Sequence, residues 1–419
     1  MLLSHLLNRI VGVGQLTVID ATGRTHRFGP GGSPAVTMRL HDRALHQRLL
    51  LDPELALGEA YMEGNLTIED GSLYDLLHMC TANTTALDEH PALRLRQRLD
   101  DLGKSLQQYN PAPRAKQNVA HHYDLCGELY DLFLDADRQY SCAYFPTGRE
   151  TLDEAQQRKL IHIGAKLLLE PGMKVLDIGS GWGGLALFLA RAGQVDVTGV
   201  TLSEEQLQMS RKRAKAAGLA QQAQFHLRDY REQTGTFDRI VSVGMFEHVG
   251  ARHYDEFFGK VRDLLDDQGV ALLHSIGRTH GPGTTNPWIR KYIFPGGYAP
   301  ALSEVLAAIE RAGLWVTDVE ILRLHYAATL REWSRRFAEH RAEVKAIYDE
   351  RFCRMWEFYL AVSEIAFRNL GHMVFQIQLA RRVDAVPMTR DYINEWERQH
   401  LAAATAPANS RRTLRRASR

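Results

Sequence analysis

Residues Val175 to Gly184, which read Val-Leu-Asp-Ile-Gly-Ser-Gly-Trp-Gly-Gly, constrain this chain more than any other stretch. An apolar run predicted as a strand leads into a glycine turn and then directly into a helix. Gly179, Gly181 and Gly183 have no side chain, so the backbone there can adopt positive φ and approach a ligand closely. Sheets of α/β proteins bind ligands at the carboxyl ends of their strands. The stretch therefore predicts a nucleotide-sized pocket, although a tight turn without a ligand would use the same glycines.

The three glycines are spaced as Gly-x-Gly-x-Gly, whereas dinucleotide-binding folds use Gly-x-Gly-x-x-Gly. In those folds the N-terminus of the following helix binds phosphate groups. S-adenosylmethionine (SAM) has no phosphate group to place there. The spacing therefore suits SAM better than a pyrophosphate.

The length of 419 residues suggests two domains, and a formal net charge of +1 gives no general attraction to nucleic acid. The four cysteines lie far apart and form no Cys-x-x-Cys pair: Cys80, Cys126, Cys142 and Cys353. This pattern indicates neither a zinc site nor a disulfide framework, so we expect no metal and a reducing, cytoplasmic location.

The two ends of the chain give further expectations. The first 13 residues contain no convincing cleavage site, and no apolar run approaches the roughly 18 residues that a membrane span requires. We therefore expect a soluble protein that is at most peripheral to a membrane. The last ten residues contain five arginines and no acidic residue. This basic tail suits contact with anionic lipid or nucleic acid, and the alternative is a solvated, disordered end.

The chain divides into four predicted parts. Residues 1–100 combine strand-like pieces at 16–20 and 36–40 with helical patterns from Asp42 and Leu73, which predicts a small mixed α+β domain. Residues 101–113 contain prolines and are predicted as a linker. Residues 114–400 form the predicted main domain, and residues 401–419 form the basic tail.

Strands and helices alternate regularly in the main domain, which predicts a parallel sheet. Thr151 and Glu154 are spaced as a capping box at the start of a helix over 152–169. Further helices are predicted over 203–217, 254–265 and 302–312, and a long amphipathic helical region over 329–368. The predicted strands are 174–178, 195–201, 224–228, 237–243, 270–276, 315–322 and 374–379. This order is that of a Rossmann-like SAM-dependent methyltransferase domain, an α/β fold with a seven-stranded, mostly parallel sheet and here a helical insertion before the last strand.

The end of the second strand of this domain departs from the usual pattern. Methyltransferase folds commonly place an acidic residue there to hold the ribose hydroxyls, but this chain reads Val-Thr-Leu-Ser-Glu-Glu-Gln over residues 200–206. Gln206 can bind the ribose instead. It can equally reach back and close a capping box with Ser203. The local sequence leaves both interpretations open.

Six sequence blocks, in this order, resemble cyclopropane-fatty-acyl-phospholipid synthases and the related mycolic acid cyclopropane synthases. The blocks are His-His-Tyr-Asp-Leu (121–125), Tyr-Ser-Cys-Ala-Tyr-Phe (140–145), the glycine turn, Gly-Val-Thr-Leu-Ser (199–203), Phe-Glu-His-Val (246–249) and Leu-His-Ser-Ile-Gly (273–277). The resemblance covers residues 16–393. It includes a substrate-binding N-terminal domain that the phospholipid enzymes have, with Leu-Gly-Glu-Ala-Tyr-Met at 57–62.

The resemblance implies transfer of the SAM methyl group to a cis double bond of an acyl chain in a membrane phospholipid. A carbocation forms, and loss of one proton to a bound bicarbonate closes the cyclopropane ring. It further implies a homodimer that works at the anionic inner face of the cytoplasmic membrane. No nucleic acid is expected as a partner, since the tail is the only basic run and no Asn-Pro-Pro-Tyr motif occurs.

The family's bicarbonate-binding residues carry over to Cys142, Glu247, His274, Ile276 and Tyr326. Histidine, tyrosine and main-chain N–H groups donate hydrogen bonds to an anion, while Glu247 can accept the bicarbonate O–H or take the proton itself. Without the family, each residue has another interpretation. Cys142 can be a small buried residue, Glu247 a solvated carboxylate, His274 a hydrogen-bonded core histidine, and Tyr326 a packing residue.

The family's SAM-binding pattern carries over to several regions of the chain. Tyr140 and Ser141 match the contacts to the methionine part, and Asp177 with the glycine turn matches the contacts to the sulfonium and adenosine. Thr201, Leu202 and Gln206 match the ribose contacts, which resolves the question about Gln206 toward binding. The remaining matches are Tyr230 and Arg231 beside the adenine, Val243 before the Glu247 loop, and Tyr123 over the cofactor or acyl chain, unless Tyr123 is a structural aromatic residue.

Two residues depart from the family pattern. Ser180 replaces a cysteine of the glycine turn, a change between small residues. Ser363 stands where many relatives carry a cysteine, and because serine ionises far less readily than a thiol, we expect no catalysis from it. Two alternatives to ring closure remain. They are a methyl- or methylene-branched product and a non-catalytic lipid-binding protein that kept the fold.

Overall fold

The computed structural model describes residues 2–82 and 127–405 of the chain. The predicted linker, Tyr123 and residues 406–419 lie outside this part. The predicted tail starts at residue 401, but the last helix, α18 (Asp391–Thr405), continues to Thr405. Within the described part, no helix has the length and apolar composition that crossing a membrane requires.

The N-terminal residues form a four-stranded sheet in the order β2-β1-β3-β4, with β1 and β3 parallel and the other pairs antiparallel. Its strands are β1 (Gly14–Ile19), β2 (Thr25–Gly31), β3 (Ala35–Leu40) and β4 (Leu66–Asp70). Its helices are α1 (Leu2–Ile10), α2 (Leu45–Leu51), α3 (Pro53–Met62) and α4 (Leu73–Thr81). The predicted strands at 16–20 and 36–40 are confirmed as β1 and β3. The sequence did not predict β2, since its Phe-Gly-Pro-Gly end lacks apolar alternation.

The main domain contains a seven-stranded sheet in the order β10-β11-β9-β8-β5-β6-β7. Only β11 runs antiparallel to its neighbours, so the predicted α/β class with a mostly parallel sheet is confirmed. The strands are β5 (Lys174–Ile178), β6 (Asp196–Thr201), β7 (Ala223–Leu227), β8 (Phe237–Val243), β9 (Leu265–Arg278), β10 (Trp315–Leu322) and β11 (His372–Ala380). The central strands β5 and β8 are largely buried on both faces, as covered parallel strands require.

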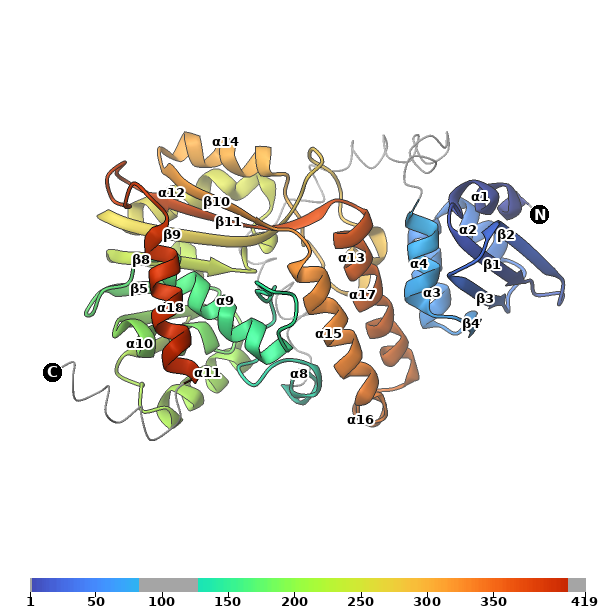
Figure 1. Cartoon of the computed structure of the whole chain (residues 1–419), viewed down its shortest axis with the longest axis horizontal. Helices are drawn as coiled ribbons and strands as arrows, with labels where there is room; N and C mark the ends of the chain where they lie inside the picture. The colour runs from blue at the N-terminus through green and yellow to red at the C-terminus, as the bar shows by residue number, and fades with distance from the viewer. Residues whose placement is uncertain (1, 83–126, 406–419) are drawn as a thin grey trace.

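Helices cover both faces of this sheet (Figure 1). They are α9 (Leu152–Lys166), α10 (Gly184–Gly193), α11 (Glu204–Ala216), α12 (Tyr254–Leu264) and α14 (Leu302–Ala312). Two further helices of this domain, α8 (Gly127–Phe133) and α13 (Pro287–Tyr292), pack against other helices. Three short 3-10 helices lie in the connections: η1 (Tyr230–Glu232) between β7 and β8, and η2 (Phe246–His248) and η3 (Ala251–His253) between β8 and α12. The predicted capping box forms at the start of α9, where Glu154 Oε2 accepts the Thr151 N–H at 2.9 Å.

The predicted helical region 329–368 is confirmed as helical and consists of three helices. They are α15 (His325–Glu339), α16 (Arg341–Ile347) and α17 (Glu350–Asn369). The Asp349 carboxylate accepts the Phe352 N–H at 2.7 Å and starts a new helix there, which explains the break. The insertion lies between β10 and β11, as predicted.

The N-terminal helices α3 and α4 pack against α17 of the main domain (Figure 1). Tyr61 on α3 donates a 3.0 Å hydrogen bond to Glu357 Oε2 on α17. Glu59 accepts hydrogen bonds from Lys291 and Tyr292 on α13, at 2.8 and 2.9 Å. These contacts place the N-terminal domain against the helical insertion.

Candidate active site

The glycine turn between β5 and α10 adopts the predicted positive φ angles. The values are +84° at Gly179, +53° at Gly181 and +81° at Gly183. A Cβ atom added to Gly179 would lie 2.7 Å from the Cβ of Met245, and one added to Gly183 would lie 2.8 Å from the Cβ of Ser210. Gly179 and Gly183 are therefore required by both backbone conformation and space.

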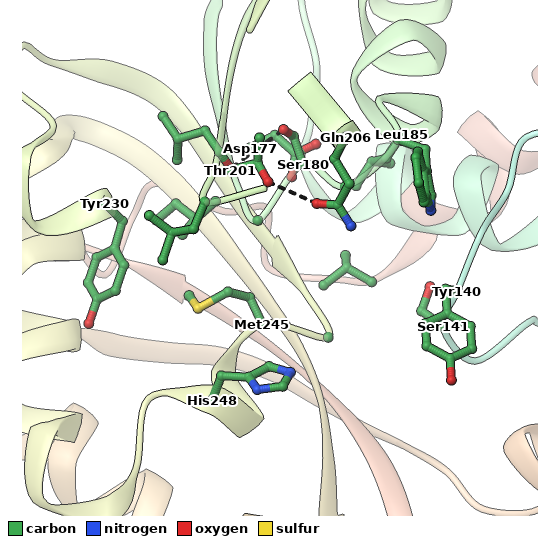
Figure 2. Close-up of a pocket in the computed structure, with 18 of the residues that line it drawn as sticks. Tyr140, Ser141, Asp177, Ser180, Leu185, Thr201, Gln206, Tyr230, Met245 and His248 are labelled. Carbon is green, nitrogen blue, oxygen red and sulfur yellow. Dashed lines mark hydrogen bonds between the residues drawn. The ribbon is translucent and has the colours of Figure 1, made fainter. Parts of the chain in front are cut away.

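A cavity of about 160 Å³ opens at this turn, at the carboxyl ends of β5, β6 and β8. We call it the glycine-turn cavity. It is lined by all but one of the predicted SAM-binding residues among those described: Tyr140, Ser141, Asp177, Gly179, Gly181, Thr201, Leu202, Gln206, Tyr230, Arg231 and Val243. Gly183, the N-cap of α10, is the exception, and a Cβ there would meet Ser210 and Phe225. Figure 2 shows six of these residues around the cavity: Tyr140, Ser141, Asp177, Thr201, Gln206 and Tyr230.

The side chain of Gln206 is committed to the cavity rather than to a capping box. Ser203 does cap α11, since its Oγ accepts the Gln206 N–H at 3.3 Å. The Gln206 Oε1 atom, however, accepts a 2.8 Å hydrogen bond from Thr201 Oγ1, drawn as a dashed line in Figure 2. The amide group is thus fixed at the cavity wall, where it can donate to a ligand.

Asp177 presents an unsatisfied acceptor at the same place. Its side chain is buried, and Oδ2 has no hydrogen-bond partner among the described residues. Burial raises the pKa of this carboxyl to about 7. A buried polar atom without a partner is costly, so a ligand that donates a hydrogen bond fits here. Elsewhere in the glycine-turn cavity, the Arg231 guanidinium donates a 2.6 Å hydrogen bond to Asp229 Oδ2. It also lies over the ring of Tyr230.

A second cavity, of about 340 Å³, adjoins the first, and we call it the Glu247 cavity. All five residues carried over for bicarbonate line it: Cys142, Glu247, His274, Ile276 and Tyr326. They come from the loop after α8, from η2, from β9 and from α15, so the fold brings together residues that are far apart in the sequence. The helical insertion contributes Val362 and Ser363, and α3 of the N-terminal domain contributes Glu54.

Glu247 is half-buried, and its Oε2 atom is enclosed rather than solvated, which contradicts the alternative interpretation of this residue as a solvated carboxylate. Its Oε1 atom accepts the main-chain N–H of Ile276 at 2.7 Å. Oε2 has no hydrogen-bond partner among the described residues, and burial raises the pKa of the carboxyl to about 7. The sequence-based expectation that the Ile276 N–H donates to an anion needs correction, because this N–H is already used to orient Glu247.

His274 and Cys142 are both uncharged in this environment. Burial lowers the pKa of His274 to about 3, and the Gln376 amide hydrogen-bonds to His274 Nδ1 at 3.1 Å, an arrangement that suits the tautomer with its proton on Nε2. Burial raises the pKa of the Cys142 thiol, whose Sγ–H donates to the Ala143 carbonyl at 3.3 Å. A neutral thiol is a poor nucleophile. Tyr326 packs edge-on against Trp333, with ring centres 5.8 Å apart.

Four residues line both cavities: Tyr140, Ser141, Gly244 and His248. The Tyr140 hydroxyl lies 2.8 Å from that of Tyr359 on α17. Burial lowers the pKa of His248 to about 4, so this histidine is neutral. Sequence reasoning did not assign His248 a role, although it directly follows Glu247 in a quoted block. The two cavities therefore adjoin at these four residues, which we call the shared wall. A ligand bound in one cavity can contact a ligand bound in the other there.

The two departures from the family pattern also line the cavities. Ser180 lies in the glycine-turn cavity and Ser363 in the Glu247 cavity. The Glu247 cavity further includes residues that sequence reasoning missed, such as Arg278, Tyr298 and His372. They come from the end of β9, the segment after it and the start of β11, which carry no motif.

Comparison with known proteins gives consistent matches. The family model described as mycolic acid cyclopropane synthetase matches residues 111–377, and a model of a domain of unknown function matches residues 3–90. A probable fatty acid methyltransferase of Pseudomonas putida is 40% identical, with 82% of this chain and 86% of that protein covered. The cyclopropane-fatty-acyl-phospholipid synthase of Escherichia coli K12 is 36% identical, with 84% and 90% covered.

A third relative, the tuberculostearic acid methyltransferase UfaA1 of Mycobacterium tuberculosis, is 33% identical, with 90% of each chain covered. Among solved structures, mycolic acid cyclopropane synthase CmaA1 in complex with SAH and CTAB superimposes with a TM-score of 0.61 at 33% identity. The superposition covers 65% of this chain and 99% of that one. The cyclopropane synthase MmaA2 of Mycobacterium tuberculosis has the same TM-score, identity and coverage.

Proposed function

Because the chain belongs to the mycolic acid cyclopropane synthetase family and is a SAM-dependent methyltransferase, we propose that it is a cyclopropane-fatty-acyl-phospholipid synthase. One observation carries the proposal. The five residues carried over for bicarbonate line a single cavity, and this cavity shares a wall with the glycine-turn cavity.

The glycine-turn cavity is the proposed SAM site. Asp177 Oδ2 offers an unsatisfied acceptor and the Gln206 amide offers donors, which fits a ligand with both amino and hydroxyl groups. In the proposed orientation, Tyr140 and Ser141 hold the methionine part, while Thr201, Leu202 and Gln206 hold the ribose. Tyr230 and Arg231 flank the adenine, and Val243 closes the cavity near the shared wall.

The Glu247 cavity is the proposed site of the acyl chain and the base. When bound, SAM supplies the methyl group, and bicarbonate supplies the acceptor for the proton that leaves. Glu247 Oε2, which has no other partner among the described residues, accepts the bicarbonate O–H and so fixes which oxygen faces the reacting carbon. His274 and Tyr326 donate to the remaining oxygens. Glu247 as the direct proton acceptor is the competing role.

An alkene is a weak nucleophile, so the protein contributes mainly position and exclusion of water. The aromatic rings of Tyr140, Trp333 and Tyr326 pack in sequence beside the cavity, with the Tyr140 and Trp333 centres 5.1 Å apart. Tyr140 and Tyr326 line this cavity, and such rings keep water from a cationic centre. Exclusion of water suits a carbocation that has to lose one particular proton.

The same site supports a second candidate, a methyl- or methylene-branched fatty acyl product. Two relatives, the UfaA1 enzyme at 33% identity and the Pseudomonas putida protein at 40%, carry the name methyltransferase rather than cyclopropane synthase. The two outcomes differ only in the fate of the cation. The presence of the complete set of five proposed bicarbonate residues favours ring closure.

The proposed substrate also implies where the protein works. A phospholipid acyl chain has to leave a membrane to reach a buried cavity, so we propose peripheral binding to the anionic inner face of the cytoplasmic membrane. A homodimer remains a prediction from the family resemblance.

The proposal is tested by incubating purified protein with SAM and vesicles of a phospholipid with cis-monounsaturated chains. We expect the acyl chains to gain the mass of one methylene group, with loss of the vinyl protons and appearance of cyclopropane protons by NMR. A methyl or methylene branch in the product would establish the second candidate instead. Absence of SAM turnover on any unsaturated lipid would contradict both.

A further inference from the structure

Lys159 on α9 carries a buried amino group that the proposed function does not use. Its side chain has no exposed surface. Its Nζ lies 2.7 Å from Ser141 Oγ and 2.8 Å from Gln139 Oε1. Lys159 lines neither cavity, whereas Ser141 lines both. A buried ammonium group is costly, so its position behind a wall residue of the active site calls for an explanation.

The direction of the contact determines what Ser141 can do. An ammonium group only donates hydrogen bonds, so Ser141 Oγ accepts from Lys159, and the Ser141 hydroxyl hydrogen stays available for another acceptor. The main chain is held as well, because Gln156 Nε2 donates to the carbonyls of Gln139 and Ser141, at 3.1 and 3.0 Å. The serine is therefore anchored on its α9 side, and its hydroxyl hydrogen can meet a ligand.

The charges around Lys159 leave this cation without a directly paired carboxylate among the described residues. Asp135 and Asp137 lie near enough to favour the ammonium form, but Asp135 Oδ1 and Oδ2 already accept the main-chain N–H groups of Gln139 and Asp137. The other titratable groups that face it, Cys142 and His274, are neutral. The positive potential of Lys159 is thus only partly compensated within the protein.

We propose that Lys159 is a positioning residue that orients and polarises the Ser141 hydroxyl as a hydrogen-bond donor to a carboxylate-type anion. The anion is either the methionine carboxylate of SAM or the bicarbonate, since Ser141 lines both cavities. This inference rests on the proposed placement of these ligands.

The test uses the purified full-length Lys159→Met variant, which keeps the length and apolar stem of the side chain. Its affinities for S-adenosylhomocysteine (SAH) and for methylthioadenosine, which lacks the carboxylate, are measured by calorimetry. If Ser141 holds the methionine carboxylate, SAH binding weakens about tenfold or more, while methylthioadenosine binding changes less than about twofold. If Ser141 holds bicarbonate, both affinities stay unchanged and the bicarbonate concentration for half-maximal activity rises about tenfold instead. If neither changes, the inference is wrong.

Lys166 provides a matched control on the same helix. It is equally buried but pairs with Glu320 and Asp318, and none of these three residues lines either cavity. Lys166→Met is expected to lower stability while leaving the ratio of SAH to methylthioadenosine affinity and the bicarbonate dependence unchanged. If Lys166→Met changes the affinity ratio or the bicarbonate dependence as much as Lys159→Met does, Lys159 contributes only to the general stability of the protein.

Ser141→Ala separates this inference from the proposed ligand placement. It should reproduce the selective loss, and adding Lys159→Met to it should cause no further loss. If Ser141→Ala changes neither the SAH affinity nor the bicarbonate requirement, the proposed placement of these ligands is wrong. If Ser141→Ala weakens binding but Lys159→Met does not, only the role of Lys159 fails.

If the Lys159→Met variant does not fold, the wild-type protein still permits a test. Burial lowers the pKa of Lys159 to about 8, so the ammonium group is lost above that pH. For a Ser141 contact to the methionine carboxylate, the preference for SAH over methylthioadenosine falls more steeply above pH 8 in wild type than in Ser141→Ala. For a contact to bicarbonate, it is the bicarbonate requirement that rises more steeply. If the SAH preference and the bicarbonate requirement each depend on pH in the same way in wild type and Ser141→Ala, the inference is wrong.

Discussion

The main-chain N–H of Ile276 donates a 2.7 Å hydrogen bond to Oε1 of Glu247, which leaves Oε2 as the oxygen of this buried carboxylate that can meet a ligand. The carboxylate is therefore held in one orientation by β9. An acceptor fixed in this way suits a ligand that donates a single proton, such as the O–H of bicarbonate.

Replacing Glu247 with glutamine should lower turnover while leaving cofactor affinity nearly intact. The amide oxygen of the new side chain could still accept from Ile276, but its NH2 group would face the ligand as a donor instead of an acceptor. We expect kcat to fall about 100-fold or more, with SAH affinity within about twofold of wild type. Steady-state kinetics and calorimetry measure the two quantities, and equal losses in both would mean that Glu247 contacts SAM.

The same substitution should stabilise the protein at alkaline pH. The pKa of Glu247 is about 7 in the folded state and near 4.5 when unfolded, so ionisation favours the unfolded chain as the pH rises from 4.5 to 7. Above that range the free energy of unfolding of wild type has fallen by on the order of 3 kcal/mol, whereas that of the glutamine variant has not. Thermal unfolding should give Glu247→Gln a higher Tm than wild type at pH 8. The difference in Tm should vanish near pH 4.5. The exposed Glu310→Gln is the control, and a pH-independent difference would contradict the prediction.

Two glycines of the turn should respond differently to alanine. A Cβ on Gly179 would meet Met245 at 2.7 Å, whereas one on Gly181 would meet nothing within 4 Å. Both positions have positive φ, which costs about 1 kcal/mol for alanine. Gly181→Ala should lower the free energy of unfolding by about that amount, and Gly179→Ala should lower it by about 1–3 kcal/mol more. Urea unfolding measures both, and equal losses would mean that Met245 moves aside freely.

Ser363 should prove dispensable for chemistry. It lines the Glu247 cavity from α17, but a serine hydroxyl is rarely ionised and the proposed proton acceptor is elsewhere. Ser363→Ala and Ser363→Cys should both keep kcat within about threefold of wild type in the vesicle assay. A gain of about tenfold or more in the cysteine variant would indicate that a thiol has a role here.

The regular alternation of buried strands and amphipathic helices made most of the main domain predictable. The signal failed where an element is exposed or broken locally. Strand β2 ends in Gly-Pro-Gly and is mostly exposed, so it shows no two-residue period. The break before α17 depends on Asp349, whose capping role was visible in principle but competes with the continuing apolar pattern.

The site divides in a similar way. The glycine turn is local and could be predicted, whereas the side-chain direction of Gln206 depends on the Thr201 hydroxyl, which only the fold brings into reach. Family resemblance supplied the five residues of the Glu247 cavity, but not the use of the Ile276 N–H by Glu247. Lys159 did leave a signal. It follows Leu152 by seven residues and Ala155 by four, which places it on the inner face of α9.

The reversed direction of β11 has a consequence for which parts of this structure can vary independently. Because β10 and β11 are antiparallel neighbours, residues 323–371 amount to one enlarged hairpin loop that leaves and re-enters the sheet at the same edge. A loop of this kind can change its length and lining without disturbing the register of the strands. Changes in this loop can thus alter the wall that Val362 and Ser363 contribute to the Glu247 cavity, while the strands that carry the glycine turn keep their register.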